Sequence, residues 1–185
     1  MTQLATARLL LRPWRRQDFA AFAALNADPQ VMAHFPAVLD RAASDAVAER
    51  VLAHFDRHGY GPWAVEIPGV TTFAGFVGLM IPSFAAHFTP CVEIGWRLAR
   101  SSWGRGYATE AARAALAYGF ETVGLDEIVA MTVPINARSI RVMRGLGMTS
   151  DPADDFDHPN LPPDHRLRRH VLYRLRRGDW LSSAG

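Results

Sequence analysis

Hydrophobic residues along the chain follow two spacings, one typical of helices and one typical of strands. Apolar side chains recur every three or four positions over residues 17–27 and 41–57, which predicts two helices. Asp28-Pro29 ends the first helix, because the residue before a proline is disfavoured in helical geometry, and Gly59 is a typical cap for the second. Two more helices are expected, an alanine-rich one over residues 107–122 and another over 136–146.

Short apolar runs bounded by proline or glycine predict the strands. They cover residues 6–13, 62–67, 73–81, 91–98, 126–133, the stretch from 148 onward, and 167–175. The second and third runs flank a Pro68-Gly69 turn and should pair antiparallel. The runs on either side of helix 107–122 form a strand–helix–strand unit and should be parallel. This order predicts a single α+β domain over residues 1–185 with a mixed sheet, not a doubly wound nucleotide-binding fold.

The composition excludes several chemistries. All 20 basic residues are arginine, and the missing lysine removes P-loop nucleotide hydrolases, Schiff-base enzymes and lysine-dependent kinases. Cys91 is the single cysteine, which excludes an intrachain disulfide and a multi-cysteine metal site. A net charge of +2 gives no support for nucleic-acid binding. No apolar run approaches the roughly 18 residues of a membrane span, so we expect a cytoplasmic protein without a membrane partner.

A loop with two glycines joins the predicted strand 91–98 to helix 107–122. The first N–H groups of a helix lack partners within it, and the helix dipole favours an anion at that end. Gly104 and Gly106 carry no side chain that would block an anion, and Arg105 adds positive charge. The loop therefore has the parts of a pyrophosphate site. A plain strand-to-helix turn has the same spacing, and the glycines alone do not decide between the two.

The wider context of this loop resembles a known superfamily. The string VEIGWRLARSSWGRGYATEAARAALAYGF, followed by a strand and then NARSIRVMRGLGM, closely resembles the GNAT superfamily of acyl-CoA-dependent N-acetyltransferases. The family's loop has glutamine or arginine where Trp103 stands here. That tryptophan, the opening TARLLLRPW, the segment GYGPWAVE and the ending RRHVLYRL look like the branch named for ribosomal-protein N-terminal acetyltransferases. The resemblance covers residues 6–177 and implies a GNAT-like sheet of about seven mostly antiparallel strands with about four helices.

The resemblance also implies how acetyl-CoA binds as the co-substrate. In the family, the strand before the loop splays from its parallel neighbour, and the pantetheine arm hydrogen-bonds the exposed backbone. The expected pantetheine contacts are then Trp96, Arg97 and Leu98, with Asn136 beside the thioester and also capping its helix. The pyrophosphate is expected on the backbone of Gly104, Arg105, Gly106, Tyr107, Ala108 and Thr109.

Two residues are candidates for the acid–base steps. The branch is thought to place a hydroxyl near the departing sulfur, and Ser139 stands at that position. Many relatives use a tyrosine one turn farther along, where this chain has Met143, which cannot donate a proton. Glu93 is the candidate base, because the reaction needs a neutral amine and a carboxylate in mid-sheet is costly unless used or paired. The alternatives are a helix-start hydroxyl for Ser139 and a carboxylate paired with an arginine for Glu93.

The acceptor pocket of this fold is built from the first two helices and the loop between the last strands. The expected substrate-binding residues are His34 and Phe35 in the first segment and Asp157 and His158 in the second. An acidic rim over residues 150–166 would suit a cationic amine, although a solvated surface loop explains the same composition. Asp157, His158 and His165 show no recognised metal-ligand spacing, so we expect no metal. No GxSxG elbow is present for a hydrolase.

The sequence therefore predicts an N-acetyltransferase that moves an acetyl group from acetyl-CoA directly to a primary amine. The acceptor is a protein N-terminus or a small-molecule amine, and a homodimer remains an open possibility. The alternative is an acyl-CoA-binding module that senses or scaffolds without turnover. Met143 favours that alternative, and Glu93, Asn136 and Ser139 favour the enzyme.

Overall fold

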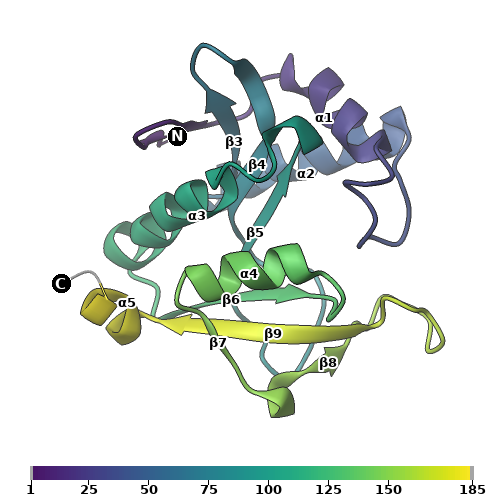
Figure 1. Ribbon diagram of the computed structural model, residues 1–185, viewed down its shortest axis with the longest axis vertical. Helices are drawn as coiled ribbons and strands as arrows, with labels where there is room; N and C mark the ends of the chain where they lie inside the picture. Colours follow the sequence, from purple (N-terminus) through teal and green to yellow (C-terminus); the bar gives the residue numbers. More distant parts are fainter. Residues whose placement is uncertain (1, 184–185) are drawn as a thin grey trace. The chain divides into compact units, whose positions relative to one another are not determined.

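The computed structural model describes residues 2–183 and divides the chain into two compact units. The first unit comprises residues 1–80 and 95–115, and the second comprises residues 81–94 and 116–185. Strand β5 (Glu93–Leu98) begins in the second unit and ends in the first. Figure 1 labels most of the helices and strands. The fold class is mixed α+β with mostly antiparallel strands and one parallel pair, as the sequence predicted.

The first unit contains a run of antiparallel strands. β1 (Leu4–Ala5), β2 (Leu10–Arg12), β3 (Pro62–Ile67) and β4 (Thr71–Met80) pair each with the next. The end of β5 follows, where the Ala99 N–H donates to the Ala74 carbonyl at 2.8 Å. Gly75 has φ +130°, and a Cβ there would stand 2.1 Å from the Arg97 carbonyl oxygen. Only glycine allows this close approach of two backbones.

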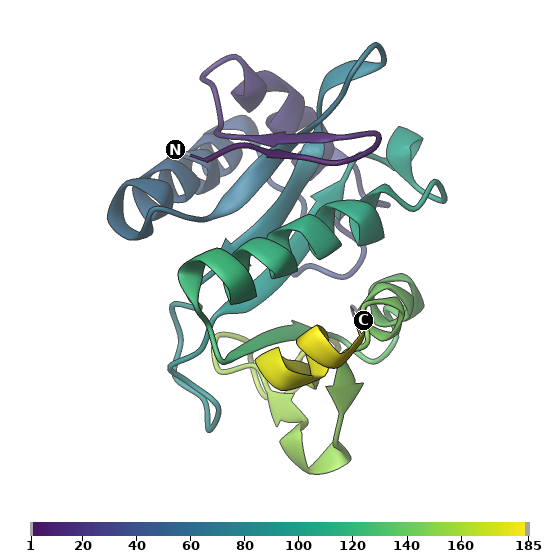
Figure 2. The same cartoon turned by 90° about the vertical axis from the view of Figure 1, so that its left-hand side faces the viewer.

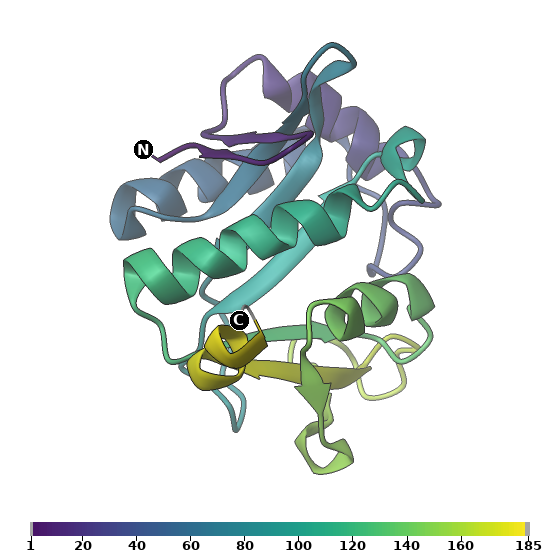
Figure 3. The ribbon, with the colours of Figure 1, turned by 60° about the vertical axis from the view of Figure 1, so that its left-hand side comes forward.

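Three helices of the first unit cover its strands. α1 (Asp18–Ala27) and α2 (Arg41–His58) lie on one face of β3 and β4, and α3 (Tyr107–Ala117) lies on the other (Figures 2 and 3). Asp40 caps α2 by accepting the Ala43 N–H at 2.8 Å, and Gly59 at φ +74° ends it as predicted. Between these layers Phe22, Phe55 and Trp63 are fully buried.

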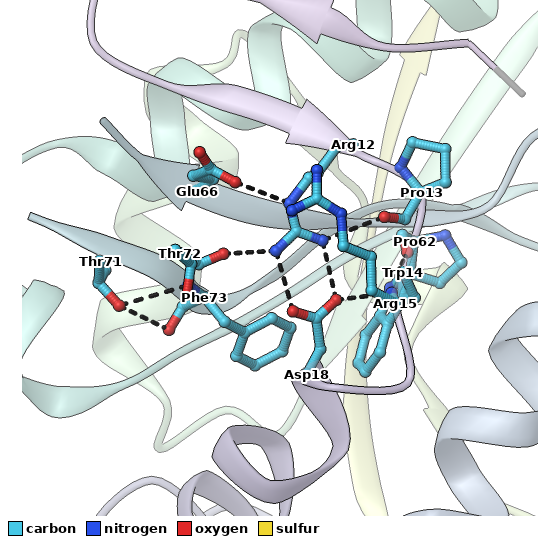
Figure 4. Close-up of polar contacts among 10 residues, drawn as sticks. All are labelled: Arg12, Pro13, Trp14, Arg15, Asp18, Pro62, Glu66, Thr71, Thr72 and Phe73. Atoms are coloured by element: carbon cyan, nitrogen blue, oxygen red, sulfur yellow. Dashed lines mark hydrogen bonds and ion pairs between the residues drawn. The ribbon is translucent and has the colours of Figure 1, made fainter. Parts of the chain in front are cut away.

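A buried ion-pair network joins β2, α1 and β3. The Arg12 side chain is 0% exposed and donates to both oxygens of Asp18 at 2.8 and 2.9 Å (Figure 4). Its Nε donates to Glu66 at 2.8 Å, and its other contacts are the carbonyls of Pro13 and Thr72. These acceptors compensate for the desolvation of the guanidinium, which a buried charge requires.

The second unit is built around β9 (Arg169–Arg176). This strand pairs antiparallel with β6 (Glu127–Thr132), β7 (Thr149–Ser150) and β8 (Phe156–Asp157). Glu93 at the start of β5 pairs with Val129 in the parallel register, which confirms the predicted parallel pair. The second unit contains a buried hydrophobic cluster of Phe88, Val129, Phe156 and Leu172.

The helices of the second unit follow its strands. α4 (Ala137–Gly145) packs on β6, and α5 (Arg177–Ser183) follows β9 (Figure 1). A π-helix (Tyr118–Val123) continues α3, and short 3-10 turns cover Arg100–Ser102 in the first unit and Pro152–Asp154 in the second. Gly124 at φ +80° ends the π-helix.

Two expectations about the fold were wrong in detail. The predicted strand 6–13 is a hairpin, because the Thr6 N–H donates to the Leu9 carbonyl at 2.9 Å and turns the chain between β1 and β2. Within residues 2–183 there are nine strands and five α-helices, against about seven and four expected. The elements that were not expected are two-residue strands and α5, which are not detectable from apolar patterns in the sequence. No helix in the described part of the chain is long and apolar enough to cross a membrane.

Candidate functional site

The loop before α3 is open at Gly104, whereas a Cβ at Gly106 would lie 3.5 Å from the Arg8 Nη2. The Trp103 indole donates to the Leu98 carbonyl at 2.8 Å and fixes the start of the loop to the end of β5. Gly104 and Gly106 have φ +73° and +78°, in the left-handed region that favours glycine. A Cβ at Gly104 would meet nothing within 4 Å, so space lies over the backbone.

This geometry fits the predicted anion site. The Glu110 N–H is the first in α3 to find a helical partner, the Gly106 carbonyl at 3.0 Å. The preceding N–H groups of Tyr107, Ala108 and Thr109 have no acceptor one turn earlier, because a helix leaves its first donors unsatisfied. Open space, unsatisfied donors and the positive end of a helix dipole therefore occur together.

Arg8 lies against this loop, and sequence reasoning missed it. Its Nε donates to Glu110 at 2.7 Å, its Nη1 donates to the Arg105 carbonyl at 3.0 Å, and its guanidinium lies over the Tyr107 ring. Glu110 also accepts from the Thr6 hydroxyl at 2.6 Å. Desolvation would raise the pKa of Glu110, but the hydrogen bonds from Thr6 and Arg8 outweigh it and lower that pKa. A charged residue within the apolar run TARLLLRP was the available signal.

Glu93 carries a desolvated carboxyl group in the second unit. Burial raises its pKa from 4.5 to about 7. Among the described residues no side chain makes an ion pair or a hydrogen bond with this carboxyl. The alternative of a carboxylate paired with an arginine therefore finds no support, and Glu93 has the protonation behaviour of a group poised near neutral pH.

Arg97, at the end of β5 in the first unit, brings the predicted Phe35 into a cluster with two residues that the sequence did not indicate. Its guanidinium lies 3.9 Å from the Phe35 ring centroid and 5.5 Å from that of Phe76. Its Nη1 donates to the Asn26 Oδ1 at 2.7 Å. Burial lowers the pKa of Arg97 to about 10. His34 is half-buried beside Phe35, whereas on β5 Trp96 is half-buried and Leu98 is buried.

The Asn136–Ser139 pair starts α4 in the second unit. Asn136 Oδ1 accepts the Ser139 N–H at 3.2 Å, which is the predicted cap. Asn136 Nδ2 donates to the Ser139 Oγ at 3.1 Å and to the Thr132 Oγ1 at 2.9 Å. Because the Ser139 oxygen accepts from Asn136, its own hydrogen points to another atom. Met143 is 1% exposed and belongs to the core.

The acidic loop of the second unit is partly neutralised. Asp157 forms ion pairs with Arg168 and Arg169 at 3.3 and 3.5 Å. Asp154 accepts from Arg174 at 2.7 Å. These pairs reduce the negative potential that the sequence alone suggested for this rim.

His158 lies in an aromatic cluster of the same unit. Its ring centroid is 4.6 Å from that of Phe84 and 5.2 Å from that of His170. Desolvation, with the neighbouring His170, lowers the pKa of His158. Among residues 2–183 no group of three or more His, Cys, Asp or Glu side chains is placed to hold a metal ion.

Comparisons with known proteins decide the family. The model of the acetyltransferase (GNAT) domain matches residues 8–149, which is more than half of the chain. The chain belongs to the GNAT acetyltransferase family. It is therefore an acetyl-CoA-dependent acetyltransferase, as predicted.

Individual relatives agree with this family. The chain is 30% identical to the uncharacterized N-acetyltransferase YnaD of Bacillus subtilis, over 96% of this chain and 98% of YnaD. It resembles the crystal structure of an Agrobacterium tumefaciens acetyltransferase with a TM-score of 0.77 and 29% identity, over 95% of each chain. The structure of Mycobacterium smegmatis RimJ has a TM-score of 0.74 at 23% identity, over 100% of this chain and 95% of RimJ, which shows a shared fold.

Proposed function

We propose that this GNAT protein transfers an acetyl group from acetyl-CoA directly to a primary amine, the acceptor being a protein N-terminus or a small molecule. The observation that carries the proposal is the left-handed backbone at Gly104 and Gly106, with open space over Gly104, before the N-terminus of α3. Such a loop offers backbone donors to a pyrophosphate. The RimJ structure with the same fold contains CoA-disulfide, which supports CoA as the ligand.

In this proposal, different groups of residues bind different parts of the two substrates. The backbone of Trp96, Arg97 and Leu98 would bind the pantetheine arm. The loop Gly104, Arg105, Gly106, Tyr107, Ala108 and Thr109 would bind the pyrophosphate, and Asn136 would lie by the thioester. His34, Phe35, Asp157 and His158 would line the acceptor pocket, with the whole chain acting as one domain.

The proposed reaction is a single displacement. The amine nitrogen attacks the thioester carbonyl carbon, a C–N bond forms, and the C–S bond breaks. Glu93 takes the proton that the amine loses, directly or through water, for which a pKa of about 7 is suitable. Ser139 would donate a proton to the departing thiolate, which Met143 cannot do. The desolvated Glu93 and the organised Asn136–Ser139 pair favour turnover over a silent binding module.

A matched pair of glycine variants tests the cofactor site. Gly104→Val places a side chain over the loop. Gly59→Val adds the same side chain at the end of α2, where the glycine has nearly the same φ and also has nothing within 4 Å of its Cβ position. Both variants should lose similar stability, because both strain a left-handed backbone. Only Gly104→Val should lose the rise in melting temperature on adding acetyl-CoA and the release of free CoA with an amine panel. Unchanged acetyl-CoA binding by Gly104→Val would overturn the pyrophosphate assignment.

A further inference from the structure

Arg97 is a cation in the first unit with an incomplete set of partners. Its guanidinium is stacked on Phe35 and flanked by Phe76, and Asn26 accepts one hydrogen bond from Nη1. The Nε atom is enclosed and has no hydrogen-bond partner. Among the described residues no carboxylate pairs with this side chain.

Arg12, in the same unit, provides a comparison, because its guanidinium has a full set of hydrogen-bond acceptors. Arg12 meets two carboxylates and two carbonyls, and its pKa is raised, chiefly by the hydrogen bond with Asp18 and in spite of its burial. Arg97 has one neutral acceptor, and burial lowers its pKa. A guanidinium carries five N–H donors in a planar fork, so most of those of Arg97 lack a protein acceptor. Its desolvation is therefore uncompensated by charge, and an anionic ligand would supply the missing partner.

The geometry also says what kind of anion would fit. Stacking on Phe35 fixes the plane of the guanidinium and leaves its edge for hydrogen bonds. A fixed planar fork matches a carboxylate, which can accept two parallel N–H bonds. Phe35 is one of the two residues of the first unit that the family resemblance assigned to the acceptor pocket, so the anion is assigned to the acceptor.

We propose that Arg97 binds a carboxylate of the acceptor, so that the preferred substrates are amines that also carry a carboxylate, such as amino acids. This rests on the proposed function. The carboxylate is unchanged in the reaction. The amine nitrogen forms the new bond to the acetyl carbon, the C–S bond of acetyl-CoA breaks, and the proton lost by the amine balances the thiol of free CoA. Arg97 therefore contributes to acceptor specificity and not to the chemical step.

The test compares each amino acid with its own amide, in the wild type and in Arg97→Gln. L-phenylalanine with L-phenylalaninamide and 4-aminobutyrate with its amide make two pairs, and kcat/KM is measured from free CoA release. Arg97→Gln should lower kcat/KM about 10- to 100-fold for the acids, as expected for a charged hydrogen bond, and less than threefold for the amides. Comparing variant with wild type for each compound cancels the different basicities of the amines.

Controls separate this role from a structural one. Arg97→Lys, which keeps the charge without the fork, should restore part of the preference for acids. Arg50→Gln removes an exposed arginine of α2 and should change neither class of acceptor. Only the backbone of residue 97 is proposed to contact pantetheine, so acetyl-CoA affinity, measured by calorimetry, should stay the same when the side chain is replaced, and melting curves report folding.

Several results would overturn the proposal. Equal losses for acids and amides would make Arg97 a structural residue, and weaker acetyl-CoA binding would assign it to the cofactor. A larger loss for phosphoethanolamine than for the amino acids would assign it to a phosphate. A wild type that releases no CoA with any amine would instead refute the proposed function itself.

Discussion

Replacing Glu93 by glutamine should make the protein slower and more stable at the same time. The folded-state pKa of Glu93 is about 7, against an ordinary value of 4.5. The folded state therefore holds the proton more tightly than the unfolded state, and this carboxyl destabilises the fold progressively as the pH rises from 4.5 to 7. The difference of roughly 2.5 pKa units corresponds to about 3 kcal/mol at pH 8. Glu93→Gln removes that cost.

The rate should move in the opposite direction. If Glu93 is the base, its replacement should lower kcat/KM about 10²–10⁴-fold near pH 7. Wild-type kcat/KM should bend near pH 7 and fall roughly tenfold per pH unit below it as Glu93 takes up a proton. The glutamine variant should lack the bend at pH 7 and rise only with the fraction of neutral amine. The deficit should shrink towards pH 9, because the amine then arrives already neutral.

The assay is kcat/KM from pH 6 to 9 with denaturant unfolding at pH 5 and pH 8, using Glu49→Gln as the control for an exposed carboxylate. The stability gain should be present at pH 8 and mostly absent at pH 5. A less stable Glu93→Gln protein with a pH-independent rate loss would refute both the desolvated carboxyl and its role as base.

Two further outcomes follow from other contacts. Ser139→Ala should lower kcat at least tenfold while acetyl-CoA affinity changes little, because charge develops on sulfur only during the reaction; equal kcat values would leave Ser139 as part of the helix start. Asp18→Ala should lower the free energy of unfolding by about 3–5 kcal/mol, because it leaves the fully buried Arg12 without its main partner. Asp45→Ala, which breaks the exposed pair with Arg41, should cost less than about 1 kcal/mol in the same urea titration.

Local signals explain why much of the fold was predictable. The helix expected over residues 41–57 is Arg41–His58, since an Asp cap and a Gly stop are encoded next to it. The parallel pair followed from strand–helix–strand order. The N-terminal hairpin was not predictable from periodicity, because its turn is held by Glu110, about a hundred positions away.

The candidate site also has parts that the sequence predicts and parts that depend on tertiary contacts. The loop of Gly104 and Gly106 is contiguous and its conformation follows from its glycines. The surroundings of Arg97 come from three separate segments, and no sequence pattern relates Asn26 and Phe76 to it. The acidic composition of residues 150–166 was visible in the sequence. The arginines that pair with it lie just before β9, at Arg168, and on β9, at Arg174, so its effective charge depends on contacts outside the loop.

The ion pair between Arg8 and Glu110 neutralises a negative charge next to the loop before α3. Glu110 lies in the first turn of that helix, where a carboxylate is favourable for the dipole but repels an incoming pyrophosphate. The salt bridge with Arg8 cancels that charge. If the loop binds the pyrophosphate as proposed, its affinity for that anion depends in part on a turn near the N-terminus. A fusion tag that disturbs residues 6–8 would uncover the negative charge and weaken CoA binding without touching the loop itself.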